Sequence, residues 1–233
     1  MVSAQFGNTL ANFGSVPLFT EDGHQLLKSS GEDPIDEAFR DIRTSLNLSA
    51  LTRSSRVLAI SSATPSEGKT FIAANLARSF ARDKKRTLLI DMDLRKPRLH
   101  KLLQDFLPPD SGKRGISNVL VGDCALSDIV IPIKELGLDA ALAGPIPPNP
   151  NELLGGGGLK KLLKDAQEKY DLVIIDTAPL LVVSDTLIIA SHGVPIILAT
   201  RLYTVTKPII RHLSERLKQV NISLAGLIAN NAD

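Results

Sequence analysis

The 233-residue sequence has one cysteine, no tryptophan, four histidines and no long uninterrupted hydrophobic run. Because Cys124 has no second cysteine to join, an internal disulfide is excluded and a thiolate metal site is not expected. The most apolar region, 172–200, is interrupted by aspartates and prolines. It therefore predicts two buried strands with a helix between them, and not a membrane span of about 20 apolar residues. The first lysine is Lys28, so the basic start of a secretory signal is missing and we expect a soluble chain.

An excess of charge of one sign is also missing, since 27 Lys and Arg residues stand against 25 Asp and Glu residues. The sequence has no long basic run of the kind that follows a nucleic-acid backbone. Nucleic acid is therefore not an expected partner. Hydrophobic residues make up 43% of the chain, which is enough for one large domain or for a domain with an arm.

The N-terminal segment 1–33 is rich in Gly, Ser, Asn and Thr and has no hydrophobic period. This composition favours an arm that is partly flexible. A helix is predicted to begin at Asp33-Pro34, with the aspartate as N-cap and the proline in the first turn. The apolar residues of its buried face are Ile35, Phe39, Ile42 and Leu46. We expect residues 34–233 to form the main domain.

From residue 56 onwards, short apolar runs alternate with amphipathic stretches. The runs predict strands at 56–61, 87–91, 139–143, 172–176, 194–200 and 223–229, and the stretches predict helices at 69–82, 159–169 and 207–219. Strands that are apolar throughout are buried on both faces. The pattern therefore predicts an α/β fold, a doubly wound and mostly parallel sheet with helices on each side. Ligands of such sheets bind outside the carboxyl ends of the strands.

The segment 61–70, SSATPSEGKT, joins the first of these strands to a helix. It fits the phosphate-binding pattern G-x-x-x-x-G-K-[ST], except that Ala63 replaces the first glycine and Pro65 lies within the loop. In such a loop, backbone N–H groups and the helix N-terminus bind phosphates. Lys69 would neutralise the β- and γ-phosphates, and the Thr70 hydroxyl would bind Mg²⁺. The alternative is an ordinary strand–turn–helix connection that happens to contain Gly-Lys-Thr.

Three aspartates follow two of the predicted strands. Asp91 and Asp93 come at the end of LLIDMD, and Asp176 ends LVIID. Because the carboxyl ends of parallel strands meet at one edge of a sheet, these side chains are expected beside the Gly-Lys-Thr loop. They offer ligands for Mg²⁺ and a base that accepts a hydroxyl proton or orients water. Helix capping is the alternative for one aspartate alone, but the combination indicates nucleoside triphosphate chemistry.

In these motifs the chain resembles the cytoplasmic kinase domain of the bacterial tyrosine kinases (BY-kinases) that regulate capsular and extracellular polysaccharide synthesis. The resemblance covers roughly residues 34–233. It depends on EAFRDIRTSL (37–46), SSATPSEGKT (61–70), LLIDMDLRKP (88–97), AGPIPPNPNELL (143–154), YDLVIIDTAP (170–179) and AGLIAN (225–230). Pro and Glu within the phosphate loop are common in this family. The resemblance implies a P-loop NTPase fold with an N-terminal helical arm, and an ATP-dependent protein tyrosine kinase.

The resemblance also implies the residues of the site. Those expected to bind ATP or ADP are Ser66, Glu67, Gly68, Lys69, Thr70, Phe71 and Asn230. Those expected to bind Mg²⁺ are Thr70, Asp91 and Asp176. The implied catalytic residues are Lys69, Asp91, Asp93 and Asp176, with Asp93 favoured over Asp91 as the base. The implied ring contacts are Glu37, Arg40 and Arg43, which match E-x-x-R-x-x-R; an exposed helix face with one ion pair is the alternative.

Some positions keep two interpretations. Asn230 either lies near the adenine or is an ordinary turn residue. Arg95 either meets phosphate or neutralises the acidic cluster. The Pro-rich stretch 143–154 is expected to shape the wall of the site, and the glycine run 155–158 is expected to be a flexible loop before a helix.

The partners implied by the resemblance are a homo-oligomeric ring, tyrosine-bearing protein substrates and a transmembrane polysaccharide co-polymerase that activates the kinase. The membrane partner, or an upstream segment missing from this sequence, would hold the chain in the cytoplasm at the inner face of the membrane. The sequence departs from the family in having only Tyr170 and Tyr203 where a C-terminal tyrosine cluster is usual. Tyr170 opens a predicted buried strand. The acceptor tyrosine is therefore expected on another chain.

Two other functions remain as alternatives. One is a nucleotide-gated ATPase scaffold of the polysaccharide machinery with little kinase activity. The other is a partitioning-type P-loop ATPase. Thr64 stands where those ATPases have a second lysine in the loop, and a membrane-targeting amphipathic C-terminal helix is missing. Both features disfavour the partitioning function.

Overall fold

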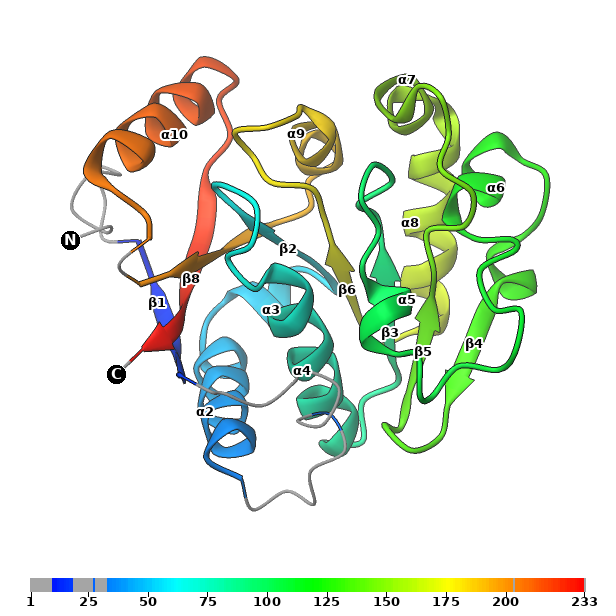
Figure 1. Cartoon of the computed structure of the whole chain (residues 1–233), viewed down its shortest axis with the longest axis horizontal. Coiled ribbons are helices and arrows are strands. Elements are labelled where there is room, and N and C mark those ends of the chain that lie inside the picture. The colour runs from blue at the N-terminus through cyan, green and yellow to red at the C-terminus, as the bar shows by residue number, and fades with distance from the viewer. Residues whose placement is uncertain (1–9, 19–26, 28–32, 203, 233) are drawn as a thin grey trace.

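The computed structural model describes residues 10–18, 27, 33–202 and 204–232. Within these ranges, eight strands form one sheet in the order β1-β8-β7-β2-β6-β3-β5-β4 (Figure 1). The strands are β1 (Asn12–Pro17), β2 (Val57–Ser62), β3 (Thr87–Asp91), β4 (Val130–Ile133), β5 (Leu138–Ala141), β6 (Leu172–Asp176), β7 (Ile196–Arg201) and β8 (Leu224–Ala232). All neighbouring strands are parallel except β4 and β5. The expected mostly parallel α/β sheet is confirmed.

Helices cover both faces of this sheet, with α2 and α4 together on one side and α8, α9 and α10 on the other (Figure 1). The helices are α2 (Pro34–Leu48), α3 (Leu51–Ser54), α4 (Lys69–Arg82), α5 (Leu99–Leu102), α6 (Ile116–Val121), α7 (Pro150–Gly155), α8 (Gly157–Lys169), α9 (Asp185–Ser191), α10 (Lys207–Gln219) and the 3₁₀ helix η2 (Leu126–Asp128). In the described ranges no helix is both long and apolar enough to cross a membrane.

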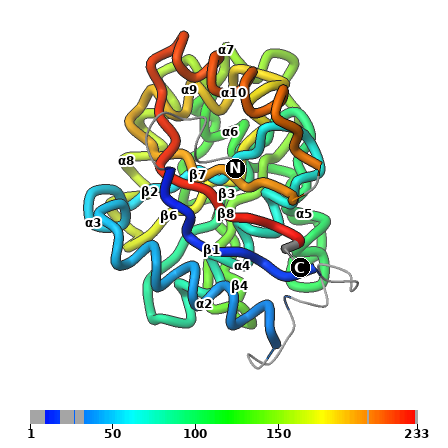
Figure 2. The backbone as a smooth tube through the Cα atoms, turned by 90° about the vertical axis from the view of Figure 1, so that its left-hand side faces the viewer, coloured from blue at the N-terminus to red at the C-terminus, as the bar shows by residue number. Residues whose placement is uncertain are grey.

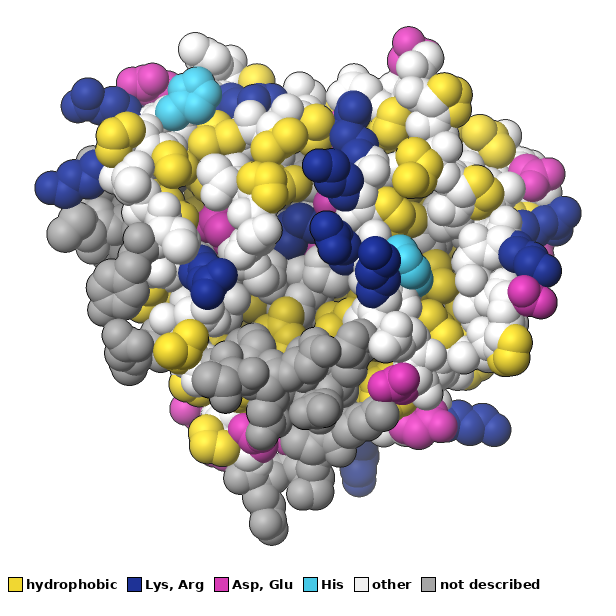
Figure 3. All heavy atoms as spheres, in the orientation of Figure 1, with side chains coloured by type: hydrophobic (Ala, Val, Ile, Leu, Met, Phe, Trp, Pro, Cys, Tyr) yellow, Lys and Arg dark blue, Asp and Glu magenta, His cyan; other side chains and the backbone are white. Residues whose placement is uncertain are grey.

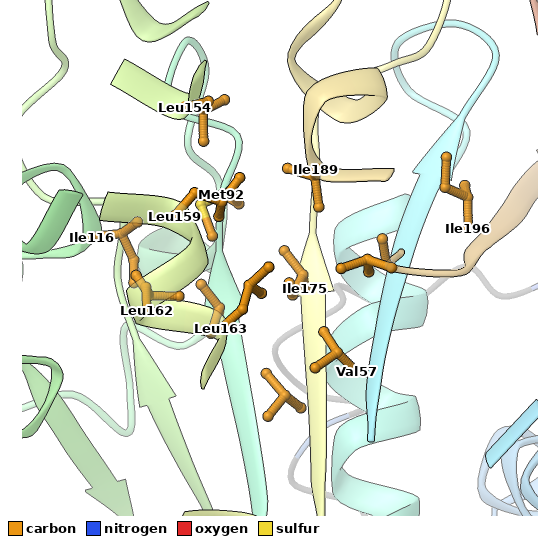
Figure 4. Close-up of a cluster of buried hydrophobic side chains, with 14 of the residues drawn as sticks. Val57, Met92, Ile116, Leu154, Leu159, Leu162, Leu163, Ile175, Ile189 and Ile196 are labelled. Atoms are coloured by element: carbon orange, nitrogen blue, oxygen red, sulfur yellow. The ribbon is translucent and has the colours of Figure 1, made fainter. Parts of the chain in front are cut away.

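Alternate residues of the central strands belong to two different hydrophobic cores, one on each face of the sheet. In β6, Val173 and Ile175 join the cluster under α8, α9 and α10, while Leu172 and Ile174 join the cluster under α2 and α4. Figure 4 shows Ile175 within the first cluster. Side chains of a strand alternate between faces, so a strand covered on both sides must be apolar at every position. This explains the continuous apolar runs of the sequence.

The start of α2 agrees with the sequence. Asp33 Oδ1 accepts a hydrogen bond of 2.9 Å from the Ile35 N–H, and Pro34 occupies the first turn. The predicted apolar face of the helix is buried. Asp36 is buried beside it, which the sequence did not lead us to expect.

The segment expected to be an N-terminal arm contains the edge strand β1, which lies parallel to β8 (Figure 2). Gly226 of β8 permits this pairing, because a Cβ there would come within 2.2 Å of the Phe13 ring. The sheet therefore begins before residue 34. Most of the remaining residues of the arm, and Tyr203, lie outside the described residues.

The glycine run 155–158 is not the flexible loop that we expected. Gly155 ends α7, Gly156 caps both helices, and Gly157 begins α8. A Cβ at Gly158 would lie 2.2 Å from the backbone oxygen of Leu120 in α6. Gly158 therefore lets two helix backbones approach closely.

Candidate active site

The phosphate loop joins β2 to α4 at the carboxyl edge of the sheet. Its last residue, Gly68, has a φ of 88°, and a Cβ there would lie 2.0 Å from the Asn230 amide nitrogen. Asn230 Nδ2 donates a hydrogen bond of 3.0 Å to the Glu67 backbone oxygen. Glycine is thus required for two reasons, its left-handed backbone and the close approach of β8. Asn230 supports the loop from behind.

Glu67 is the second support of the loop. Its Oε1 accepts hydrogen bonds from the Thr64 backbone N–H at 2.5 Å and from Thr64 Oγ1 at 2.8 Å, and its Oε2 accepts one from the Arg201 N–H at 3.4 Å. Burial raises the pKa of Glu67. The side chains of Glu67 and Asn230 therefore support the loop. Their contact with nucleotide stays a prediction.

The irregular start of the loop has a simple explanation. Ala63 is fully buried and is not among the described residues with a positive φ, so its backbone does not need glycine. Its carbonyl oxygen accepts a hydrogen bond of 3.1 Å from the Leu181 N–H, which joins the loop to the segment after β6. Alanine fits because only its small size matters.

Lys69, Thr70 and two aspartates meet at the carboxyl ends of β3 and β6. Lys69 Nζ lies 3.0 Å from Asp93 Oδ2 and 3.5 Å from Asp176 Oδ1. Thr70 Oγ1 donates a hydrogen bond of 2.6 Å to Asp176 Oδ2. The sheet register explains this meeting, because Asp176 lies opposite Ile60 of β2 and Asp91 of β3. These contacts form the cluster that the sequence predicts.

The cluster contains more carboxyl groups than cationic groups. Burial and then the charge of Asp176 raise the pKa of Asp91 to about 8, and burial also raises the pKa of Asp176. Burial alone would lower the pKa of Lys69, but Asp176 and Asp93 outweigh it and raise that pKa. One ammonium group does not balance three carboxyl groups. A divalent cation would relieve the excess.

The donor atoms fit Mg²⁺. The Thr70 hydroxyl and the Asp176 carboxylate offer hard oxygen ligands that already touch each other. Within the described ranges no group of three or more His, Cys, Asp or Glu side chains is arranged to hold a metal by itself. The remaining ligands would therefore be phosphate oxygens and water, which is usual for Mg²⁺.

Asp91 and Asp93 have different surroundings. Asp91 Oδ1 accepts a hydrogen bond of 3.2 Å from the Asp93 N–H, and Asp91 Oδ2 accepts one of 3.0 Å from the Leu99 N–H. Both oxygens of Asp91 thus hold the turn between β3 and α5. Asp93 instead lines the open cavity, where its Oδ2 meets Lys69. Asp93 is therefore better placed than Asp91 to act as a base.

A cavity of about 510 Å³ opens in front of these groups. The predicted residues that line it are Ser66, Gly68, Lys69, Thr70, Phe71 and Asp93. Lining residues that the sequence analysis missed include Lys96, Arg98, Lys101, Val182 and Val183. Figure 3 shows Lys and Arg side chains gathered in the middle of this face. The short stretch RKPRLHK at 95–101 was the signal for the cations.

Arg95 binds a carboxylate outside the cluster. Its guanidinium lies 2.8 Å and 3.1 Å from the two oxygens of Asp185, which is fully buried at the start of α9. Asn151 Nδ2 of α7 donates a further hydrogen bond of 3.2 Å to Asp185. The helix α7, at the end of the Pro-rich stretch 143–154, is thereby held against the segments that follow β3 and β6. No residue of this stretch lines the cavity, so it does not form the wall that we expected.

Tyr170 lies far from the cavity. It precedes β6, while Asp176 ends that strand, and five residues of strand span about 17 Å. Its hydroxyl donates a hydrogen bond of 2.7 Å to Asp139 Oδ2, and the ring is buried. Burial raises the pKa of this phenol. These contacts agree with the structural role that we predicted for Tyr170.

The three residues expected at a ring contact lie on α2, and none of them lines the cavity. Glu37 and Arg40 form an ion pair of 2.8 Å with side chains 59% and 45% exposed. Arg43 Nη1 donates a hydrogen bond of 2.6 Å to the Ser79 backbone oxygen of α4. Arg43 therefore joins α2 to α4 within the chain.

Known proteins resemble this chain in sequence and structure. The family model described as an AAA domain matches residues 55–225. The tyrosine-protein kinase etk of Escherichia coli is 34% identical over 202 residues, which cover 85% of this chain and 27% of that protein. The tyrosine-protein kinase wzc of Salmonella typhimurium is 35% identical over 195 residues, which cover 84% of this chain and 26% of that protein. The chain thus spans about a quarter of the length of these curated relatives.

Solved structures agree. The kinase domain of the Escherichia coli tyrosine kinase ETK has a TM-score of 0.87 and 29% identity, covering 100% of this chain and 93% of that one. The VpsO kinase domain has a TM-score of 0.74 and 34% identity. The match covers 83% of this chain and 93% of that one. Cobyrinic acid a,c-diamide synthase from Mycobacterium smegmatis, solved with an ATP analogue and magnesium, has 24% identity and a TM-score of 0.61, and it shares the fold alone. The chain belongs to the bacterial tyrosine kinase (BY-kinase) family of P-loop kinase domains.

Proposed function

We propose that this chain is an ATP-dependent protein tyrosine kinase domain that regulates the synthesis and export of a capsular or extracellular polysaccharide. It transfers the γ-phosphoryl group of Mg-ATP to a tyrosine of another chain. The observation that carries this proposal is the meeting of Lys69, Thr70, Asp93 and Asp176 at one cavity. The family relatives are named as tyrosine kinases, which supports this activity.

Binding of the phosphates rests on the loop and on Lys69. The backbone N–H groups of 65–70 and the N-terminus of α4 bind the phosphate oxygens. Lys69 leaves its two aspartates and moves to the β- and γ-phosphates, because phosphate carries more negative charge than either carboxylate. Thr70 and Asp176 would hold Mg²⁺, and the ion would supply neutralisation of charge on the transferred group. The supports from Glu67 and Asn230 keep the loop in shape.

Transfer requires a tyrosine hydroxyl in line with the leaving oxygen. Asp93 accepts the hydroxyl proton, since its Oδ2 becomes available once Lys69 moves to the nucleotide. Asp91 holds the turn that fixes the position of Asp93. The buried phenol of Tyr170 is bound to Asp139 at the opposite edge of the sheet. This burial of Tyr170 supports an acceptor tyrosine that is presented in trans.

The cellular setting is part of the same proposal. The domain acts in the cytoplasm at the inner face of the membrane, next to a transmembrane polysaccharide co-polymerase that activates it, and it assembles into a homo-oligomeric ring. The exposed ion pair of Glu37 and Arg40 on α2 supports a contact between subunits.

The test is phosphate transfer to a tyrosine peptide. The protein is incubated with Mg-ATP, a tyrosine-bearing tail peptide and the cytoplasmic segment of the activator, and the phosphate is mapped by mass spectrometry. We expect phosphotyrosine on the peptide, a large loss of rate in Asp93→Asn, and no product from the matched phenylalanine peptide. ATP hydrolysis without phosphotyrosine would favour the scaffold function instead, and phosphate mainly on Tyr170 would overturn transfer in trans.

A further inference from the structure

Three cations line the cavity without an ion-pair partner among the residues that the structure describes. Lys96, Arg98 and Lys101 are exposed, and among the described residues none of their side chains forms an ion pair. Arg95 next to them differs, because Asp185 binds its guanidinium. Cationic side chains that form no ion pair with the described residues are available to bind a ligand.

The sheet order separates these cations from the phosphate loop. They lie on the segment that follows β3, while the phosphate loop follows β2, and β6 lies between the two strands. Two strand spacings amount to about 10 Å. In the proposed function, the loop backbone and Lys69 already bind the nucleotide phosphates. The three cations therefore line the β3 side of the same cavity, next to Asp93.

The position of the cations is fixed relative to the proposed base. Asp93 Oδ1 accepts a hydrogen bond of 3.1 Å from the Lys96 N–H, and Asp91 Oδ2 accepts one from the Leu99 N–H. Leu99, the first residue of α5, is fully buried. These contacts fix the backbone that carries the cations relative to Asp93, so a peptide that binds the cations lies near the proposed base.

The local field at α5 is positive. The pKa of the neighbouring His100 lies below its usual value because of burial and then because of the charges of Lys101 and Arg98. The lining also includes the apolar side chains of Val182 and Val183. The ring of an acceptor tyrosine packs against apolar side chains of this kind. Carboxylates next to the tyrosine in the peptide form ion pairs with the cations.

From this arrangement we infer that Lys96, Arg98 and Lys101 select acceptor tyrosines that have acidic residues close by in the sequence. Arg98 and Lys101 are three residues apart, about 4.5 Å along a helix axis at 1.5 Å per residue. This spacing is comparable to that of carboxylates two positions apart, which share one face of an extended peptide. The inference rests on the proposed kinase function, because it names the substrate class of the same site.

The test compares two acceptor peptides and two triple variants. One peptide has glutamates on both sides of its tyrosine, and the other has glutamines there. The variant Lys96→Gln, Arg98→Gln, Lys101→Gln removes the three cations. The control variant Lys207→Gln, Arg211→Gln, Lys218→Gln removes two lysines and one arginine that are exposed on α10 and do not line the cavity.

Binding is measured by fluorescence anisotropy with phenylalanine versions of both peptides and the protein loaded with Mg-ADP. We expect the first variant to weaken binding of the acidic peptide about tenfold, which corresponds to about 1.4 kcal/mol. Exposed ion pairs contribute about 0.2–1 kcal/mol each, so three of them account for this change. The control variant and the glutamine peptide should show no such change, and salt should weaken the acidic peptide most.

Equal affinity of the two peptides for the wild-type protein would overturn the inference. So would a tenfold loss of Mg-ADP affinity in the first variant without any effect on the acidic peptide, because the cations would then serve the nucleotide. The kinase assay separates the two proposals. Acidic selectivity in binding without phosphotyrosine on any peptide would count against the kinase function alone, and phosphorylation of both peptides with equal KM would count against the inference alone.

Discussion

At the scale of single residues, the acidic side chains of the site divide into two kinds. Glu67 and Asp91 hold backbone N–H groups of the loops, while Asp93 and Asp176 contact Lys69. The first kind fixes geometry and the second kind meets the reactants. This division explains why so many carboxyl groups lie within one small volume.

Lys69 has the clearest effect on binding. We expect Lys69→Met to lower the affinity for Mg-ADP about tenfold to hundredfold, because a hydrogen bond to a charged group contributes about 1.5–3 kcal/mol. Isothermal titration calorimetry measures the change, with the exposed Lys160→Met on α8 as control. Equal affinities of Lys69→Met and the wild-type protein would show that the phosphates bind elsewhere.

Asp91 should make the stability of the ligand-free protein depend on pH. Its pKa rises from 3.8 to about 8 on folding, so the folded chain binds this proton more tightly than the unfolded chain does. The stabilisation is complete below the unfolded pKa and is lost as the pH rises through the folded value. Between pH 7 and 9 the urea midpoint should therefore fall.

Asp91→Asn provides the control for this pH effect, because the amide has a similar shape and does not ionise. The variant should show a smaller fall of the urea midpoint between pH 7 and 9 than the wild-type protein. The lowered pKa of His100 moves its titration away from this window. An unchanged fall in Asp91→Asn would assign the effect to another group.

At the scale of elements, the glycine run offers a matched pair of substitutions. Gly158→Ala should lower the free energy of unfolding by about 1–3 kcal/mol, because its Cβ would meet the Leu120 backbone oxygen. Gly157→Ala meets no atom within 4 Å and should be neutral or stabilise α8 by up to about 1 kcal/mol. Urea denaturation compares the two variants. Equal effects would mean that α6 and α8 do not approach as closely as described.

The contact between α2 and α4 depends on a buried charge. Asp36 Oδ1 lies 2.6 Å from Arg78 Nη1, and Asp36 Oδ2 lies 3.0 Å from Arg82 Nη1. Asp36→Ala should lower the free energy of unfolding by about 3–5 kcal/mol, because the buried Arg78 would lose its counter-charge. The neighbouring Glu37→Ala removes an exposed pair and should cost less than about 1 kcal/mol. Similar denaturation midpoints for both variants would contradict this ranking.

At the scale of the whole molecule, the sequence predicts best those elements that a repeated local pattern of apolar residues specifies. The central strands and long helices follow from apolar periods, and so does the meeting of loop and carboxylates at one edge of the sheet. The sequence did not predict the edge strand β4, because this strand has only four residues and includes Pro132. Proline is tolerated in a strand at the edge of a sheet. The bond from Asn230 to Glu67 joins residues 163 positions apart, and no local pattern reports such a partner.

Assembly is the last property that we predict. Asp36 and Arg43 are used to join α2 to α4, so the more exposed Glu37 and Arg40 are the members of this helix that can meet a second copy. The double variant Glu37→Ala, Arg40→Ala should stay monomeric in light scattering at concentrations where the wild-type protein associates with Mg-ADP and the activator segment present. Lys164→Ala, Glu168→Ala removes a comparable exposed pair on α8 and should associate like the wild type. A wild-type protein that remains monomeric throughout, or equal association of both double variants, would show that this face of α2 is not the ring contact.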